Sequence, residues 1–237
     1  MVIFSRNSLD MLQMHLAVMA MGGISIPIFA GFKQETAELL IRHSEARWLT
    51  VEGDIQLKNI GTDLDLLCLI ALKPVNDRRF PSMVHFRDLL RDEGISHSPL
   101  DTTIEPQTIC LNMYTSGTMG LPKCVQLTNE NILSQQAALK QVWNVESTDR
   151  FLSYLPWHHS FGGIFELFTA LSNGATMALE SSYGRDPEVI FNNWKNIKPT
   201  IFFSVPKVYQ ALYELSKASN EAEEVFFNSG LKFIFTA

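Results

Sequence analysis

Short apolar runs alternate with helix-patterned segments along the first half of the chain. In order, the segments are an apolar run at 2–4, a helical pattern at 8–21, apolar 24–28, helical 35–45, apolar 48–51, helical 54–60 and apolar 66–72. Strands that are apolar throughout are buried on both faces, and the helices between them supply the cover. The pattern therefore predicts an α/β fold with largely parallel sheets flanked by helices.

The same alternation returns in the second half. Strands are predicted at 151–155, 175–179, 200–205 and 231–235, with helices near 163–172, 187–197 and 206–217. Pro187 suits the first turn of its helix, where no backbone N–H is needed. We place a break near 144–150, which predicts a first α/β subdomain over 1–145 and the start of a second, truncated one over 146–237. Residues 77–101 are rich in charged residues, proline and serine, and are predicted to form an irregular segment without helices or strands.

Residues 114–125 form a hydroxyl- and glycine-rich segment between two strand-like runs. Its three hydroxyl side chains and two glycines can aim O–H and backbone N–H donors at one anion, because glycine permits close approach and positive φ. Lys123 adds a positive charge. The β-prone run 108–113 precedes the segment, and Thr128 or Asn129 can cap the helix that follows. From the residues alone, phosphate binding and an ordinary hairpin turn both stay open, whereas a Walker A loop is excluded because its Gly-Lys-Ser/Thr is missing.

Composition narrows the class of protein. With 237 residues, 46% of them hydrophobic, the chain is long enough to bury a sizeable core. A net charge of −6 disfavours nucleic-acid binding as the main role. Cys68, Cys110 and Cys124 are predicted to be reduced thiols in a cytoplasmic protein. The uncharged stretch 16–31 is too short to span a bilayer and is broken by glycines and Pro27, which leaves only peripheral membrane contact open.

The segment at 114–125 resembles the phosphate loop of one enzyme superfamily. It reads Tyr-Thr-Ser-Gly-Thr-Met-Gly-Leu-Pro-Lys-Cys-Val. The adenylate-forming superfamily, which includes acyl-CoA synthetases, aryl-CoA ligases, luciferases and the adenylation domains of peptide synthetases, has aromatic-Thr-Ser-Gly-Thr-Thr/Ser-Gly-x-Pro-Lys-Gly-Val. Two positions differ. Met119 removes a hydroxyl from the cradle and Cys124 replaces a glycine, so the resemblance also leaves weakened nucleotide chemistry open.

A second match follows at 155–163, Leu-Pro-Trp-His-His-Ser-Phe-Gly-Gly, which resembles the superfamily's Leu-Pro-x-x-His-x-x-Gly segment. His159 falls on the motif histidine, which in that family lies beside the adenylate and the carboxylate substrate. From the residues alone, a histidine in an aromatic-rich segment is as often part of the core as of a site. Gly162 and Gly163 either begin a helix or leave space for an acyl chain. His158 and His159 lack the further ligands that a metal site needs, so no metal site is predicted.

The resemblance implies carboxylate activation. The substrate carboxylate attacks the α-phosphate of ATP, acyl-AMP forms and pyrophosphate leaves, and the thiol of CoA then takes the acyl group. Mg²⁺ shares the charge of the pyrophosphate. The implied site residues are His159 and Lys123 for catalysis, Thr115, Ser116, Gly117, Thr118, Gly120 and Lys123 for the pyrophosphate portion of ATP, and Trp157, His159, Phe161, Gly162 and Gly163 for the acyl substrate.

Weaker resemblances are collinear with these motifs over nearly the whole chain, at 2–8, 22–28, 199–212 and 230–237. The superfamily domain continues with Tyr-Gly-x-Thr-Glu and Thr-Gly-Asp motifs and a small C-terminal domain that carries a lysine, none of which follows here. We therefore expect an N-terminal-domain fragment of a fatty acid–CoA ligase, inactive by itself, whose partners are the acid, ATP, CoA and the remainder of the ligase. The alternatives are an acyl-AMP ligase or adenylation module that loads a carrier protein, and a non-catalytic nucleotide-binding domain.

Overall fold

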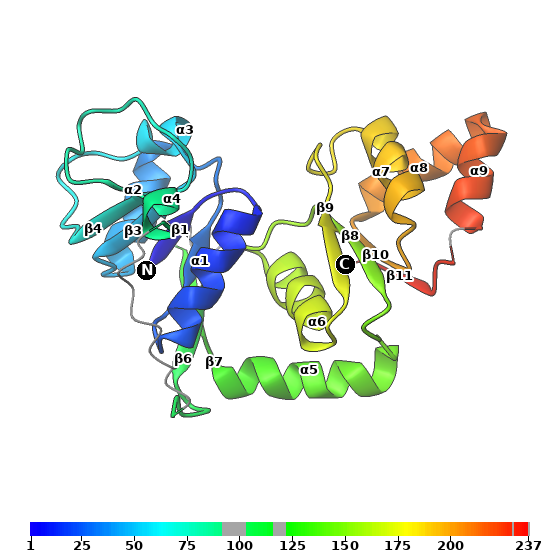
Figure 1. Ribbon diagram of the computed structural model, residues 1–237, viewed down its shortest axis with the longest axis horizontal. Helices are drawn as coiled ribbons and strands as arrows, with labels where there is room; N and C mark the ends of the chain where they lie inside the picture. Colours follow the sequence, from blue (N-terminus) through cyan, green and yellow to red (C-terminus); the bar gives the residue numbers. More distant parts are fainter. Residues whose placement is uncertain (92–102, 116–121, 229, 237) are drawn as a thin grey trace. The chain divides into compact units, whose positions relative to one another are not determined.

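In a computed structural model that describes residues 1–91, 103–115, 122–228 and 230–236, the strands fall into three sheets (Figure 1). The chain divides into two compact units, Met1–Asn131 and Ile132–Ala237. Unit 1 holds a five-stranded sheet and a two-stranded hairpin, and unit 2 holds a four-stranded sheet. Each unit has a hydrophobic core of its own.

The five-stranded sheet of unit 1 is parallel throughout, in the order β2-β1-β3-β4-β5. Its elements are strands β1 (Val2–Phe4), β2 (Ile26–Ile28), β3 (Trp48–Val51), β4 (Cys68–Ala71) and β5 (Val84–His85), and helices α1 (Leu9–Ala20), α2 (Gln34–His43), α3 (Asp54–Leu57) and α4 (Phe86–Leu89). Ser8 caps α1, since its side chain accepts a hydrogen bond from the backbone N–H of Met11. Because the chain runs outward from β1 to β2 and then returns to β3, α1 covers one face of the sheet and α2 the other (Figure 1).

The second sheet of unit 1 is a hairpin of β6 (Ile109–Thr115) and β7 (Lys123–Thr128), which pair antiparallel. The hairpin is joined to the chain just before β2, because Ser25 N donates to Cys110 O and Asn112 N donates to Ser25 O, each at 2.9 Å. Helix α5 (Asn129–Trp143) starts directly after β7. The hydroxyl- and glycine-rich segment is therefore the connection of this hairpin.

Unit 2 is built on a parallel sheet in the order β11-β10-β8-β9. Its strands are β8 (Arg150–Ser153), β9 (Thr176–Leu179), β10 (Ile201–Ser204) and β11 (Phe233–Thr236), and after α5 come the π-helix η1 (Phe161–Glu166), α6 (Leu167–Ser172), α7 (Pro187–Ile197), α8 (Pro206–Ala218) and α9 (Asn220–Phe227). Helix α6 lies on one side of the sheet, and α7, α8 and α9 lie on the other (Figure 1). Phe151, Phe202 and Phe203 are fully buried in its core.

The predicted α/β class with largely parallel sheets is confirmed. The pair β6–β7 differs from the rest of the fold because a connection of seven residues can join antiparallel strands, whereas parallel strands need a longer crossover. Residues 77–101, expected from their composition to be irregular, include β5 and α4, and residues 92–101 lie outside the described part of the chain.

The division between the units falls at 131/132, inside α5. Most of α5 belongs with unit 2 because its side chains contact that unit. Gln136 bonds to Thr169 and to the carbonyl of Ile164, and the Trp143 ring lies 5.4 Å from that of Phe203. A search of the described helices found none with the length and apolar character needed to cross a membrane.

Candidate functional site

The hairpin of unit 1 brings two of the predicted phosphate-binding residues together. Thr115, the last residue of β6, pairs with Lys123, the first residue of β7, and both are exposed. Their side chains therefore flank the base of the connecting loop. Ser116, Gly117, Thr118 and Gly120 lie outside the described residues.

Tyr114 anchors the start of this loop. Its hydroxyl lies 2.9 Å from Nδ1 of His43 and donates to Leu40 O at 3.4 Å, so it ties β6 to α2. Burial, followed by the neighbouring Cys124, raises the pKa of Tyr114 to about 12. Cys124 stands opposite Tyr114 in the hairpin, and burial raises the pKa of its thiol as well. At neutral pH both groups are therefore protonated, and the aromatic position of the motif serves as an anchor.

The second motif follows the carboxyl end of β8, a strand that lies between β10 and β9. Carboxyl ends of parallel strands are the usual place for ligands in open α/β sheets. The backbone N–H of His159 donates to Pro156 O at 3.1 Å, and that of Gly163 donates to His159 O at 2.7 Å, so the chain makes a closed turn here. The His159 side chain is exposed on this turn, whereas Trp157 is buried.

Gly162 is required by close packing of the backbone. A Cβ at this position would lie 2.7 Å from Pro156 O and 2.8 Å from Leu155 O, which is too close for any side chain. Gly163 is buried beside it. Phe161, half-buried, packs with its ring 5.6 Å from Phe203. The motif glycines thus allow the turn to fold back onto the end of β8.

His158 differs from its neighbour in the motif. It is half-buried, and its ring centre lies 4.5 Å from that of His159. Burial, and then the proximity of His159, lower the pKa of His158 to about 4, so it is neutral at physiological pH. Among the described residues, no group of three or more His, Cys, Asp and Glu side chains is placed to hold a metal ion.

One buried carboxyl beneath this turn was not predicted from the sequence. Glu166 is fully buried at the end of η1, and the hydroxyl of Ser153, the last residue of β8, donates to its Oε2 at 2.6 Å. Burial raises the pKa of Glu166 well above its ordinary value. Within the described part of the chain its Oε1 has no hydrogen-bond partner. The available signal was a single acidic residue inside the apolar run 161–168.

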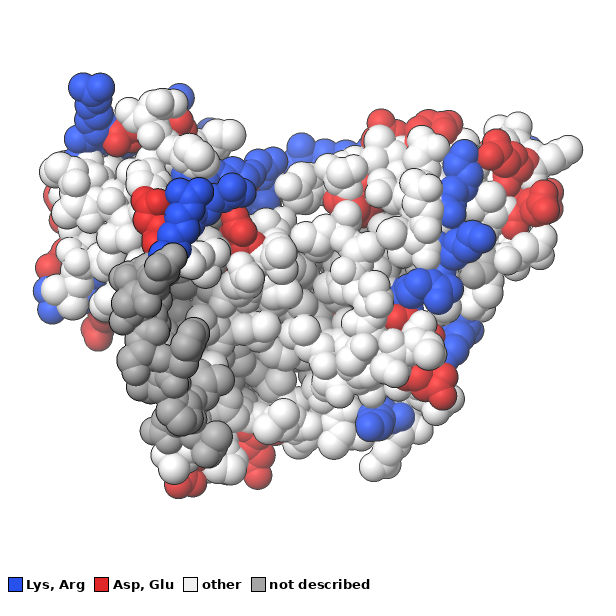
Figure 2. Space-filling model, viewed as in Figure 1, with Lys and Arg blue, Asp and Glu red and all other residues white. Residues whose placement is uncertain are grey.

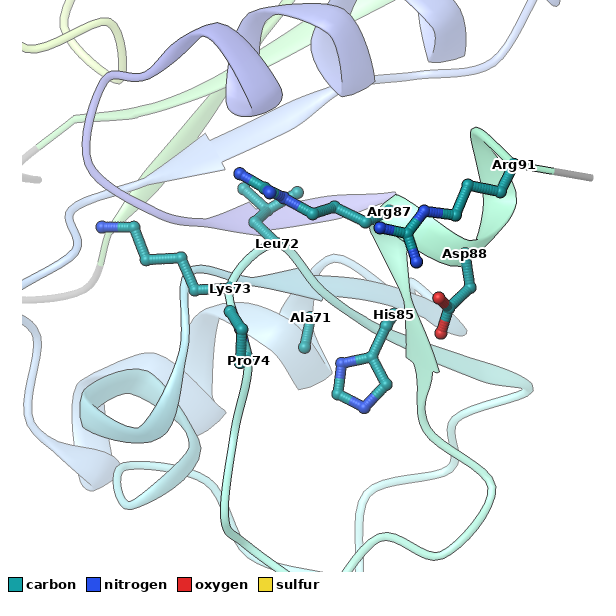
Figure 3. A pocket seen from close by; sticks show the side chains of 8 residues that line it. All are labelled: Ala71, Leu72, Lys73, Pro74, His85, Arg87, Asp88 and Arg91. Carbon is teal, nitrogen blue, oxygen red and sulfur yellow. The ribbon is translucent and has the colours of Figure 1, made fainter.

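The carboxyl edge of the unit 1 sheet carries charges instead. Glu52 follows β3 and is buried, and it binds the guanidinium of Arg6 and the ammonium of Lys73, each at 2.6 Å. Despite its burial, hydrogen bonds from these two cations lower the pKa of Glu52 to about 2. Lys73 also lines a hollow of about 380 Å³ with His85, Arg87, Asp88 and Arg91 (Figure 3). On the face shown in Figure 2, basic side chains have acidic ones beside them.

The chain was compared with known proteins. The model of the family "AMP-binding enzyme" matches residues 1–237. The human long-chain-fatty-acid–CoA ligase ACSBG2 is 26% identical over 230 residues, which covers 92% of this chain and 34% of that protein. Tyrocidine synthase 3 of Brevibacillus parabrevis is 24% identical over 219 residues, which covers 92% of this chain and 3% of that protein.

Among solved structures, ATP-bound MatB from Rhodopseudomonas palustris superimposes with a TM-score of 0.77 at 18% identity, over 99% of this chain and 44% of that one. This likeness supports the fold. The chain spans about a third of the length of the human relative that it matches. Because the family model covers the chain from end to end and both motifs lie where strands and turns present them, the chain belongs to the AMP-binding enzyme family of adenylate-forming enzymes.

Proposed function

We propose that this chain supplies the nucleotide-loop portion of an ATP-dependent acid–thiol ligase. In that reaction an oxygen of a fatty-acid carboxylate bonds to the α-phosphorus of ATP while the bond from that phosphorus to pyrophosphate breaks. The thiol of CoA then attacks the acyl carbonyl and AMP leaves. The observation that carries the proposal is the hairpin β6–β7, which holds Thr115 and Lys123 at the base of a hydroxyl- and glycine-rich loop.

Lys123 is assigned to the pyrophosphate portion of ATP. Its side chain is exposed at the loop end of the hairpin, opposite Thr115, where it is accessible to a phosphate group. Thr115, Ser116, Gly117, Thr118 and Gly120 are assigned to the same anion through their hydroxyl and backbone donors. Preorganised donors of this kind stabilise charge that develops as pyrophosphate leaves. Met119 and Cys124 reduce the number of hydroxyl donors and the freedom of the backbone in this loop.

His159 is assigned to contact with the acyl-adenylate. It is exposed at the carboxyl end of a central parallel strand, where such sheets bind ligands. Trp157, Phe161, Gly162 and Gly163 shape the turn that carries it, and the aromatic surroundings suit an apolar acid. The name of the human relative, a long-chain-fatty-acid–CoA ligase, supports a fatty acid as the substrate and CoA as the acceptor.

Mg²⁺ in this proposal is bound mainly by phosphate oxygens. Mg²⁺ is usually bound through substrate phosphates with few protein ligands, so the ion is assigned to ATP and shares its charge. A cytoplasmic location is supported by the free cysteines Cys68, Cys110 and Cys124.

Binding of ATP to the chain, followed by ATP–pyrophosphate exchange in a protein that contains it, tests the proposal. Exchange should depend on a fatty acid, and Lys123→Ala should slow it by about 10²-fold, as loss of one donor to developing charge does elsewhere. Lys58→Ala, at an exposed lysine on another part of unit 1, is the matched control and should exchange at the normal rate. Equal exchange in the Lys123 variant and the control would remove Lys123 from the site.

A second candidate is an adenylation module that passes its acyl group to a carrier protein. The match to tyrocidine synthase 3, a protein of which this chain covers 3%, favours it. The two candidates share the exchange reaction and differ in the acceptor. Product formation with CoA and with a phosphopantetheinyl carrier protein, measured side by side, separates them.

A further inference from the structure

A side-chain hydrogen bond closes the base of the turn that carries His159. Ser153 is the last residue of β8, and Glu166, thirteen residues later, is the last residue of η1. Both residues are fully buried, and the 2.6 Å hydrogen bond between them joins the two ends of the segment. This contact therefore fixes the two ends of the segment that carries His159 and Phe161 relative to each other.

The π-helix η1 has a second attachment on another side. A π turn leaves a backbone carbonyl poorly satisfied within the helix, and such turns occur often at functional sites. Here the amide of Gln136 on α5 donates to Ile164 O at 3.3 Å, and the hydroxyl of Thr169 donates to Gln136 Oε1 at 2.9 Å. Gln136 is itself buried. Two polar side chains, Ser153 and Gln136, thus hold η1 in place.

No cation compensates Glu166 among the described residues. Two titratable groups lie near Glu166: Tyr154, at the end of β8, and Tyr209, on α8. Burial raises the pKa of both phenols, and the charge of Glu166 adds to the increase. Glu180, which follows β9, faces Tyr154 and accepts hydrogen bonds from the backbone N–H groups of Ser182 and Gly184 at 2.6 Å each. An ionised Glu166 would be a buried charge with one donor and acidic neighbours, which is strongly unfavourable.

We propose that Glu166 is a positioning residue that fixes η1 on β8 through Ser153 and so sets where His159 and Phe161 lie for the acyl-adenylate. Loss of the proton leaves a buried charge, and the turn moves to admit water or a counter-ion. The role of Glu166 in substrate binding rests on the proposed function. The structural coupling of Glu166 to the His159 turn through Ser153 is independent of that function.

The link is tested on the chain itself by nuclear magnetic resonance. The Cε1–H resonance of His159 is followed from pH 6 to pH 10. In the wild-type chain it should show a step on the alkaline side when Glu166 ionises. His43, in unit 1, serves as the internal reference and should show no such step. Glu166→Gln, which is neutral at every pH, should keep the acid-side position of the His159 resonance and lose the alkaline step.

Two further variants keep the proposal open to refutation. Ser153→Ala retains the carboxyl and removes its contact with the strand, so the alkaline step should shrink or vanish. Glu221→Gln, at an exposed glutamate on α9, is the control and should retain the step. An alkaline step that persists in Glu166→Gln, or its absence from the wild-type chain, overturns the proposal.

Binding of a non-hydrolysable acyl-adenylate analogue separates this inference from the proposed function. If the analogue binds, Glu166→Ala should weaken it by about tenfold or more, since small displacements of positioned groups have effects of this size or larger, and Glu166→Gln should restore most of the affinity. Unchanged affinity in Glu166→Ala would overturn the positioning role while the proposed function stands. Failure of every form to bind, with the alkaline step present, would refute the proposed function and leave the link between Glu166 and the turn intact.

Discussion

Each of the two parallel sheets places a buried glutamate at the carboxyl end of a strand, and the two carboxyls are in opposite states. Glu52 follows β3 and binds Arg6 and Lys73, and these cations lower its pKa to about 2. Among the residues that the structure describes, Glu166 has the Ser153 hydroxyl at the end of β8 as its hydrogen-bond partner, and burial raises its pKa well above the ordinary value. Burial is therefore similar at the two sites, and the partners decide the charge.

The difference gives the two sheet edges different chemistry. In unit 1 the strand ends present an ionised network whose cations are about half exposed, with side-chain exposures of 45% for Arg6 and 54% for Lys73. In unit 2 the Ser153 hydroxyl and the Glu166 carboxyl lie at the end of β8 under the His159 turn, and the carboxyl of Glu180, which follows β9, accepts hydrogen bonds from the backbone N–H groups of Ser182 and Gly184. The carboxyls of this edge are therefore held by hydroxyl and backbone donors, whereas Glu52 is held by two cations.

The largest expected effect comes from removing the charge of Glu52. Glu52→Gln should lower the free energy of unfolding at pH 7 by about 2–3 kcal/mol, less than for a fully buried ion pair because both cations can still reach water. Urea unfolding followed by circular dichroism measures this loss. Asp65→Asn, in an exposed pair with Arg47, is the control and should change little. A loss no larger than that of the control would mean that Glu52 contributes no more than a surface pair.

Acid should reproduce this loss in the wild-type chain. A carboxyl with a lowered folded pKa contributes stability that is present above its unfolded pKa and is lost as the pH falls through the folded value. For Glu52 the window runs from its ordinary 4.5 down to about 2. The Glu52→Gln chain should lack this part of the acid-side decline.

Glu166 should give the opposite dependence on pH. Because its folded pKa is raised, its contribution to stability is complete below 4.5 and is lost as the pH rises toward the folded value. The slope is at most about 1.4 kcal/mol per pH unit. Unfolding free energies at a series of pH values should therefore fall as the pH rises above 4.5 in the wild-type chain and be flatter in Glu166→Gln. Equal slopes in the two proteins would mean that Glu166 is ionised in the folded chain.

Removing the partner of Glu166 should have a smaller effect. Ser153→Ala deletes one buried hydrogen bond and should lower the free energy of unfolding by about 1–2 kcal/mol at pH 6, where Glu166 is neutral. Denaturant titrations at pH 6 measure the loss. A loss no larger than that of the Asp65→Asn control would mean that the contact contributes no more than a surface pair.

The smallest effect is expected at an exposed pair. Asp63, whose side chain is 74% exposed, binds Arg42 at 2.7 Å, at the C-terminal end of α2. Asp63→Asn should change the free energy of unfolding by less than about 0.5 kcal/mol, and salt should abolish the difference. Thermal unfolding at low and high salt is sufficient to measure it. If Asp63→Asn cost as much as Glu52→Gln, burial would not explain why the Glu52 ion pairs stabilise the chain more than the exposed pair does.

Local pattern was sufficient for much of the fold and for the positions of both motifs. Local features can be predicted because they depend on neighbours in the sequence. Examples are the apolar strands 2–4 and 201–204 and the start of α7, where Asp186 is the N-cap and Pro187 follows it. The roles of Lys123 and His159 remain predictions from their motifs. The packing of α5 within unit 2 rests on contacts of Gln136 and Trp143 with residues about 30 or more positions away, which local sequence pattern does not specify.

The amino-acid order alone indicated which segments are strands and helices, which loop is suited to phosphate, and which histidine stands in a motif, because periodicity and turn chemistry act over a few residues. It could not indicate that Glu52 is ionised and Glu166 neutral. Glu52 meets Arg6 across 46 residues and Lys73 across 21, whereas Glu166 lies thirteen residues from its hydroxyl partner in a core without a described cation. The charge of a buried carboxyl depends on the groups that folding brings to it, and here those groups come from the ends of different strands.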